Sequence, residues 1–200
     1  MKNIVYDRYI KTYQKHGINS EALGWVSRDT QNIRFKTIKE IGIKSGESVL
    51  DVGCGFGDLH YYLKTQDVNV DYTGIDICDF FIEEAKKLQD TGCKFLVGDI
   101  FDNNINIHDW VVASGIFGLK ITDWEENVLD TTKKMFELSK KGISVNFISH
   151  YRYHPYIEDD LNIEHVVPEN LITKLIPILS NKFILRHDYT YDDFTLQFFK

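Results

Sequence analysis

The chain has 200 residues, 43% of them hydrophobic and 14% aromatic, which is enough for one sizeable core and too few to make two ordinary domains the default expectation. The 23 basic residues are outnumbered by 30 acidic ones, and the formal net charge of -7 disfavours a nucleic-acid-binding or anionic-membrane-binding surface, because phosphate binding depends on clustered Lys and Arg. No segment approaches the roughly 18 apolar residues of a membrane span. We expect one soluble domain with a small-molecule partner.

The N-terminus and the cysteines both favour a cytoplasmic protein. The first 17 residues lack the uninterrupted apolar stretch of a signal peptide. Cys54, Cys78 and Cys93 lie in apolar segments without C-x-x-C spacing. They therefore indicate neither a disulfide framework nor a zinc site.

Residues 1–46 precede the first predicted strand and look helical, so we treat them as a cap segment on a core of residues 47–200. One face of this segment carries an aromatic stripe, made of Tyr6, Tyr9, Ile10 and Tyr13. Such stripes are usually core, which predicts packing onto the sheet. The alternative is a lid over a pocket.

From Ser48 onward, short apolar runs alternate with longer segments of helical periodicity, a pattern typical of a parallel sheet covered on both faces. Strands are predicted at residues 48–54, 71–77, 93–100, 109–115 and 143–149. Helices are predicted at residues 58–64 and 79–89, with a third after residue 122.

The later helices have explicit boundary signals. Thr122 and Glu125 form a capping-box pattern, and Gly142 is expected to end the helix that they begin. Pro168 should start another helix, which Pro177 should kink or stop.

The chain ends with two strand-like runs, residues 182–189 and 193–200. The few polar residues between them are too short for a crossover helix. We therefore predict an antiparallel hairpin.

Three glycines follow the first predicted strand, in the loop that faces the ligand crevice of a doubly wound sheet. Gly53, Gly55 and Gly57 would allow a tight turn and close approach of a ligand. A dinucleotide fingerprint would need its third glycine at Asp58, and the Gly-Lys-Ser/Thr of a P-loop is missing. The ligand that remains has an adenosine end without phosphate and an ammonium group that acids such as Asp51 favour.

The run VLDVGCGFG resembles the first motif of class I S-adenosylmethionine-dependent methyltransferases; GIDI at 74–77 is similar to the second motif and GDI at 98–100 to the next. The resemblance covers about residues 45–200. It implies an α/β fold with a Rossmann-like, doubly wound, seven-stranded sheet, helices on both faces and a terminal antiparallel hairpin. It also implies S-adenosylmethionine as cofactor and in-line methyl transfer to an O or N atom of a small molecule.

The resemblance gives roles to three acids at strand ends. Asp51 would contact the methionyl ammonium, unless it caps the following loop through backbone N–H groups. Asp76 would accept both ribose hydroxyls, unless it only caps a helix. Asp99 would hold the adenine amino group or cap its own turn, with Ile77 and Ile100 as apolar walls for the ring.

Further cofactor contacts are expected in the glycine loop, at Gly53, Cys54, Gly55 and Gly57. Ser114 and Gly115 follow the fourth strand, where the transferable methyl should point. This loop lacks the Asn/Asp-Pro-Pro-aromatic pattern of enzymes that act on exocyclic or amide nitrogens, so those substrates are disfavoured. Upstream, Arg34 either grips the methionyl carboxylate or is a surface arginine.

Catalytic candidates gather in an insertion at residues 146–165, which contains His150, Tyr151 and His154. The two histidines are four residues apart, but an interrupted loop does not make both face one way, and we predict no metal. A substrate-facing aromatic loop is favoured. The His187-Asp188 pair is attributed to hairpin structure.

Two other functions stay open on sequence alone. A non-catalytic module that binds S-adenosylmethionine would have the same motifs, since fold does not fix function. A nicotinamide-dependent oxidoreductase is less favoured because of Asp58.

Overall fold

The computed structural model describes residues 2–102, 105–151 and 162–200. Its centre is one sheet with the strand order β3-β2-β1-β4-β5-β7-β6. Strands β1 to β5 pair in parallel, and β7 is antiparallel to both of its neighbours. The strands are β1 (Ser48–Val52), β2 (Asp71–Asp76), β3 (Cys93–Val97), β4 (His108–Ala113), β5 (Ser139–Ile148), β6 (Phe183–Arg186) and β7 (Asp193–Phe199). The seven-stranded sheet and the terminal antiparallel hairpin are confirmed.

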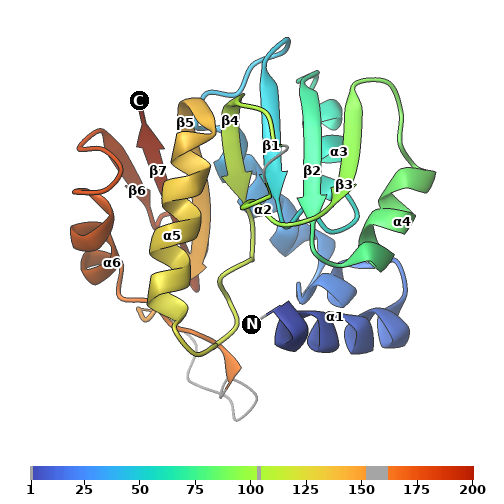
Figure 1. Cartoon of the computed structure of the whole chain (residues 1–200), viewed down its shortest axis with the longest axis horizontal. Coiled ribbons are helices and arrows are strands. Elements are labelled where there is room, and N and C mark those ends of the chain that lie inside the picture. The colour runs from blue at the N-terminus through green and yellow to red at the C-terminus, as the bar shows by residue number, and fades with distance from the viewer. Residues whose placement is uncertain (1, 103–104, 152–161) are drawn as a thin grey trace.

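Helices cover both faces of the sheet (Figure 1). One hydrophobic cluster joins the sheet to α5 and α6, and a second joins it to α2, α3 and α4. Parallel strands bury both faces in this way, which explains why their sequences read as continuous apolar runs. The helices are α1 (Lys2–His16), the short 3₁₀ helix η1 (Ser20–Leu23), α2 (Arg28–Lys39), α3 (Asp58–Thr65), α4 (Asp79–Lys87), α5 (Trp124–Glu137) and α6 (Pro168–Leu175).

The aromatic stripe of α1 packs against the start of α4, not onto the sheet. Tyr13 stacks on Phe80, and Tyr9 meets Phe81 edge to face, with ring centroids 5.3 and 5.8 Å apart. The Tyr6 hydroxyl donates to Asp79 at 2.9 Å. Figure 1 shows α1 lying across the end of the sheet toward which the β1 and β2 arrowheads point. The expectation of packing onto the sheet is wrong, because Phe80 and Phe81 supply the apolar surface that the stripe covers.

Helix α5 begins after residue 122, as predicted, but the signals predicted for its two ends are not the ones that the structure uses. Its N-cap is Asp123, in a left-handed conformation at φ 60° with no side-chain cap, so Thr122 and Glu125 form no capping box. Gly142 lies inside β5, where a Cβ atom would approach the Phe198 carbonyl oxygen to 2.3 Å. That glycine therefore permits close strand pairing. The prediction that α6 stops before Pro177 is confirmed.

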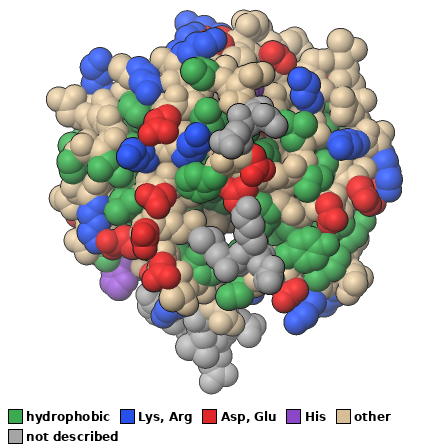
Figure 2. All heavy atoms as spheres, in the orientation of Figure 1, with side chains coloured by type: hydrophobic (Ala, Val, Ile, Leu, Met, Phe, Trp, Pro, Cys, Tyr) green, Lys and Arg blue, Asp and Glu red, His purple; other side chains and the backbone are tan. Residues whose placement is uncertain are grey.

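Two further features of the structure concern the charge on its surface and the length of its helices. On the face shown in Figure 2, Lys and Arg side chains are separated by acidic and uncharged ones and form no continuous basic patch. Within the described ranges, no helix combines the length and apolar character needed to cross a bilayer.

Candidate active site

A cavity lies beyond the carboxyl ends of β1, β2 and β4, where ligands bind in open α/β sheets. Tyr9 of α1 and Trp25, which follows η1, also line it, so the N-terminal segment forms part of its wall. Burial raises the pKa of Tyr9 to about 12, so this hydroxyl stays protonated at neutral pH. Most predicted cofactor contacts are among the lining residues, namely Asp51, Gly53, Cys54, Gly55, Asp76, Ile77, Asp99, Ile100, Ser114 and Gly115.

The glycine loop wraps this cavity in a conformation that side chains rarely adopt. Gly53 and Gly55 have φ of +71° and +55°. A Cβ at Gly53 would lie 2.3 Å from a methyl carbon of Ile116, and one at Gly55 would lie 2.7 Å from Leu23. Gly57 serves differently, because it begins α3 at φ +79° and is not among the cavity-lining residues.

Asp76 ties the glycine loop to the start of α4. Its Oδ2 accepts a hydrogen bond from the Gly55 N–H and its Oδ1 accepts one from the Cys78 N–H, each at 2.9 Å. Burial raises the pKa of Asp76, and these amide hydrogen bonds oppose that shift. Asp76 thus holds the amide of Cys78, the residue before α4, although no side chain caps the helix, and the ribose contact stays a prediction.

Asp51 has a partner that the sequence did not reveal. The hydroxyl of Tyr72, on the neighbouring strand, donates to Asp51 Oδ2 at 2.5 Å. Burial raises the pKa of Asp51 to about 7, and the hydrogen bond from Tyr72 limits the shift. No backbone amide in the described part of the chain donates to the Asp51 carboxylate, so the loop-capping alternative is not met, and Asp51 is among the residues that line the cavity.

The adenine-side residues line the same cavity. Asp99 Oδ1 accepts a hydrogen bond from the Phe101 N–H at 3.1 Å, so the turn-capping alternative is also present. Ile77 and Ile100 are apolar residues of the cavity wall, while their contact with an adenine ring stays a prediction. Ser114 has a property that the sequence motifs did not predict. Its buried Oγ has no hydrogen-bond partner within the described part of the chain. A buried polar atom without a partner at a cavity wall favours a polar ligand.

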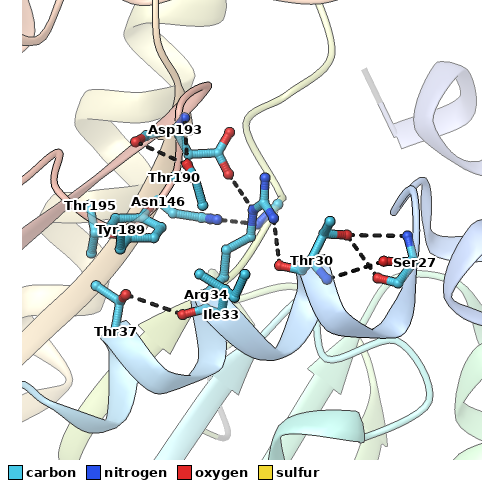
Figure 3. Close-up of polar contacts among 11 residues, drawn as sticks. Ser27, Thr30, Ile33, Arg34, Thr37, Asn146, Tyr189, Thr190, Asp193 and Thr195 are labelled. Carbon is cyan, nitrogen blue, oxygen red and sulfur yellow. Dashed lines mark hydrogen bonds and ion pairs between the residues drawn. The ribbon is translucent and has the colours of Figure 1, made fainter. Parts of the chain in front are cut away.

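Arg34 lies outside this cavity, although the sequence assigned it to a ligand carboxylate. Its Nε pairs with Asp193 at the start of β7, and its Nη1 donates to the Thr30 carbonyl at 2.5 Å (Figure 3). The guanidinium also lies 4.8 Å from the ring centroid of Trp25. With only 12% of its side chain exposed, Arg34 is not a surface arginine either. Only the fold brings Asp193, 159 residues away, to this position.

Of the catalytic candidates in the insertion, the two that the structure describes do not line the cavity. His150 and Tyr151 are exposed, their rings contact each other, and neither lines the cavity described above. His154 lies outside the described residues.

A separate cluster brings together three side chains of metal-ligating type. His60, Asp90 and Cys93 have donor atoms within 4.8 Å of one another. Lys64 pairs with Asp90 Oδ2, whereas His60 contacts Oδ1, and the Lys64 ammonium lowers the pKa of Asp90 to about 2. The carboxylate is thus already charge-balanced within the protein. The cysteines have no zinc-type spacing in the sequence, so the sequence did not predict this cluster.

The sequence comparisons identify the family. The model of the "Methyltransferase domain" family matches residues 43–175. A Mycobacterium tuberculosis protein named as a methyltransferase, Rv1506c, is 29% identical over 155 residues, which are 74% of this chain and 90% of that protein. The (S)-coclaurine N-methyltransferase of Thalictrum flavum is 30% identical over 149 residues, 69% of this chain and 39% of that enzyme.

Solved structures show the same fold. Magnesium protoporphyrin IX methyltransferase from Synechocystis PCC 6803, with bound SAH, superposes with a TM-score of 0.70 at 15% identity and covers 100% of both chains. Human N-acetylserotonin methyltransferase, in complex with SAM, has a TM-score of 0.64 at 14% identity, with 82% of this chain and 51% of that chain covered. Identities this low support a likeness in fold alone.

The fold is Rossmann-like, and its cavity lies against the loop after the first strand. The chain belongs to the methyltransferase domain family, and within it to the class I S-adenosylmethionine-dependent methyltransferases. The predictions of family, fold and enzyme class are confirmed. An oxidoreductase is not the class to which this chain belongs.

Proposed function

We propose that this chain binds S-adenosylmethionine in the cavity at β1, β2 and β4 and transfers its methyl group to an O or N atom of a small molecule. The observation that carries the proposal is the glycine loop, which lies against a cavity with a carboxylate at the end of each neighbouring strand, Asp51 and Asp76. When bound, the cofactor supplies an electrophilic methyl on a sulfonium sulfur.

The donor set of the cavity fits this cofactor. Gly53 and Gly55 add no side chain of their own to the loop, and their lack of a Cβ lets Ile116 and Leu23 approach the loop closely. Asp51 offers a buried carboxylate to a cationic amino group, and Asp76 has lone pairs beyond the two amides that it already accepts. Ser114 Oγ offers one further polar contact. A diphosphate would instead meet two buried acids without a cationic partner, which disfavours a dinucleotide.

The protein's own contribution to the reaction is alignment and exclusion of water. An in-line displacement needs the nucleophile, the carbon and the leaving atom held in one line, and such positioning can lower a barrier by several kcal/mol. Tyr9 and Trp25 close the cavity from the N-terminal segment. We assign them to shielding the reacting atoms from solvent.

The test is binding of S-adenosylhomocysteine, the demethylated product, measured by calorimetry and by unfolding. At 100 times its Kd, this ligand should stabilise the fold by about 2.7 kcal/mol. NAD is the matched control and should bind at least tenfold more weakly. If NAD binds as well, or if the folded protein binds neither ligand, the proposal fails.

Methyl transfer is tested separately from binding. The purified protein is incubated with methyl-labelled S-adenosylmethionine and a metabolite extract. Formation of labelled product, lost in Asp76→Ala, supports an enzyme. Tight binding without turnover in any extract favours the non-catalytic alternative.

A further inference from the structure

A second cavity adjoins the proposed cofactor cavity and is not explained by it. The two cavities have five wall residues in common, from the N-terminal segment and the loop after β4, namely Tyr9, Leu23, Trp25, Gly115 and Leu119. The second cavity extends from this common wall toward β5 and β7, where it is lined by Phe147, Ile148 and Ile163 together with three polar residues, Arg8, Asn146 and Asp193. Its walls are thus largely apolar and aromatic, with a small polar end.

Two of the three side chains at the polar end, Asn146 and Asp193, are buried and held by hydrogen bonds or ion pairs, whereas Arg8 is exposed. Asn146 is 4% exposed, and its Oδ1 accepts a hydrogen bond from the Gly115 N–H at 2.8 Å. This contact holds the amide at the common wall of the two cavities. Asp193 is 3% exposed and pairs through Oδ2 with Arg34. Figure 3 shows Arg34 reaching from α2 toward Asp193, with the Asn146 side chain beside the pair.

Each polar group keeps hydrogen-bonding capacity. Within the described ranges, Asp193 Oδ1 and Asn146 Nδ2 have no hydrogen-bond partner in the protein. Asp193 Oδ1 can accept a hydrogen bond, and Asn146 Nδ2 can donate one. A ligand group that both donates and accepts, such as a hydroxyl, satisfies the two together.

The charge around this end selects against charged ligands. The carboxylate of Asp193 repels an anion. A cation would meet Arg8 in the wall and the Arg34 guanidinium on the far side of Asp193. Of the charged side chains that line this end or pair with it, Arg8 and Arg34 are positive and Asp193 alone is negative, and Arg34 already pairs with Asp193, which disfavours a buried ammonium. A neutral ligand has the smallest desolvation cost here.

We infer that the second cavity is the methyl-acceptor site and that it takes a neutral, ring-bearing hydroxyl compound, whose hydroxyl donates to Asp193 Oδ1 and accepts from Asn146 Nδ2. This inference rests on the proposed function, because the adjoining cavity must hold the methyl donor. It places O-methylation ahead of N-methylation for this chain.

The experiment uses three probes of matched shape on protein saturated with S-adenosylhomocysteine. Benzyl alcohol is neutral, benzylamine is cationic and benzoate is anionic at neutral pH. Binding is followed by saturation-transfer NMR and titration. Benzyl alcohol should bind about tenfold more tightly than either charged probe.

Three variants locate the binding. Gly118 lines only the second cavity, and a Cβ there would lie 3.3 Å from Ile148, so Gly118→Val should abolish probe binding and leave the affinity for S-adenosylhomocysteine within threefold. Asp193→Asn should raise benzoate affinity about tenfold. The matched control is Asp188→Asn, on an exposed carboxylate of the same hairpin, which should change nothing.

The outcomes separate this inference from the proposed function. If the wild-type protein does not bind S-adenosylhomocysteine, both the proposed function and the acceptor assignment fail. If that ligand binds but benzyl alcohol does not, if a charged probe binds best, or if Gly118→Val leaves probe binding intact, the acceptor assignment fails while the proposed function stands. Should Asp193→Asn not fold, Arg8→Gln tests the charge argument, since it should raise benzylamine affinity and lower that of benzoate.

Discussion

The two ends of the candidate site handle buried acids in opposite ways. On the side of the site formed by β1 and β2, here called the first edge, Asp51 and Asp76 are held by neutral donors. These donors are the phenol of Tyr72 and two backbone amides. On the side of the site formed by β5 and β7, here called the second edge, Asp193 is held by the guanidinium of Arg34. Neutral donors leave the carboxylate charge available to a cationic ligand, whereas Arg34 cancels it. The first edge therefore suits a ligand with an ammonium group, and the second suits a neutral one.

The two edges also differ in how far apart their partners lie in the sequence. Asp51 with Tyr72 and Asp76 with Gly55 are each 21 residues apart, within one strand-helix-strand unit. Arg34 and Asp193 are 159 residues apart. The first edge can thus form within one local unit, but the second requires the whole sheet to be assembled.

The largest expected effect is on the ion pair of the second edge. Arg34→Met leaves the buried carboxylate of Asp193 without its cation, which should cost about 3 to 5 kcal/mol in the free energy of unfolding, measured with urea. Lys87→Met, which breaks the exposed pair with Glu84, is the control and should show no measurable change. Equal effects of the two variants would mean that burial of the pair does not matter.

A smaller effect is expected at the first edge. Tyr72→Phe removes the phenol that donates to Asp51, and an unsatisfied buried acceptor should cost about 1 to 3 kcal/mol in the free energy of unfolding. Tyr191→Phe, on a tyrosine that is 71% exposed, is the control. A neutral result at Tyr72 would show that water replaces the phenol.

The glycine loop should affect ligand affinity more than folding. Gly53→Ala and Gly46→Ala both place a side chain at positive φ, but only at Gly53 does the new Cβ meet a neighbour, a methyl group of the cavity residue Ile116. We expect the affinity for S-adenosylhomocysteine to fall at least tenfold, about 1.4 kcal/mol, in Gly53→Ala alone. Calorimetry decides this, and a parallel loss in Gly46→Ala would contradict a specific role for the loop.

The subtlest effect is a dependence on pH. The pKa of Asp51 is about 7 in the folded chain and ordinarily 3.8, so the folded state favours the protonated form. Its contribution to stability is complete below about pH 4 and is lost as the pH rises toward 7. Asp51→Asn should therefore gain stability relative to the wild type between pH 5 and pH 8 in urea unfolding. A constant difference across that range would contradict the raised pKa.

The first edge could be found from sequence because its signals are local. Glycines between a buried strand and a helix, and acids at the ends of successive strands, follow from strand periodicity and chain order alone. The same local rules failed at Gly142, whose glycine serves strand packing, and at Thr122, where Asp123 begins the helix in a left-handed conformation without a side-chain cap. A motif shows which residue types are present but not which neighbours they meet.

The second edge shows what was missed. The buried acid at the start of an apolar strand, Asp193 in DFTLQFF, was a usable signal, because a carboxylate there needs a partner. Nothing in the sequence indicated that the partner would be Arg34 or that Asn146 would lie beside it. Likewise, His60 and Cys93 come together with Asp90 only through packing of α3 beside β3.

The sequence by itself determined the alternation of strands and helices, the glycine loop and the class of enzyme, because these depend on periodicity and on short motifs. Tertiary structure alone decided the partners of the buried acids, the place of the N-terminal stripe and the existence of a second cavity. The physical reason is that burial and pairing of charge depend on distances between segments remote in the chain, and those distances exist only after the sheet has formed.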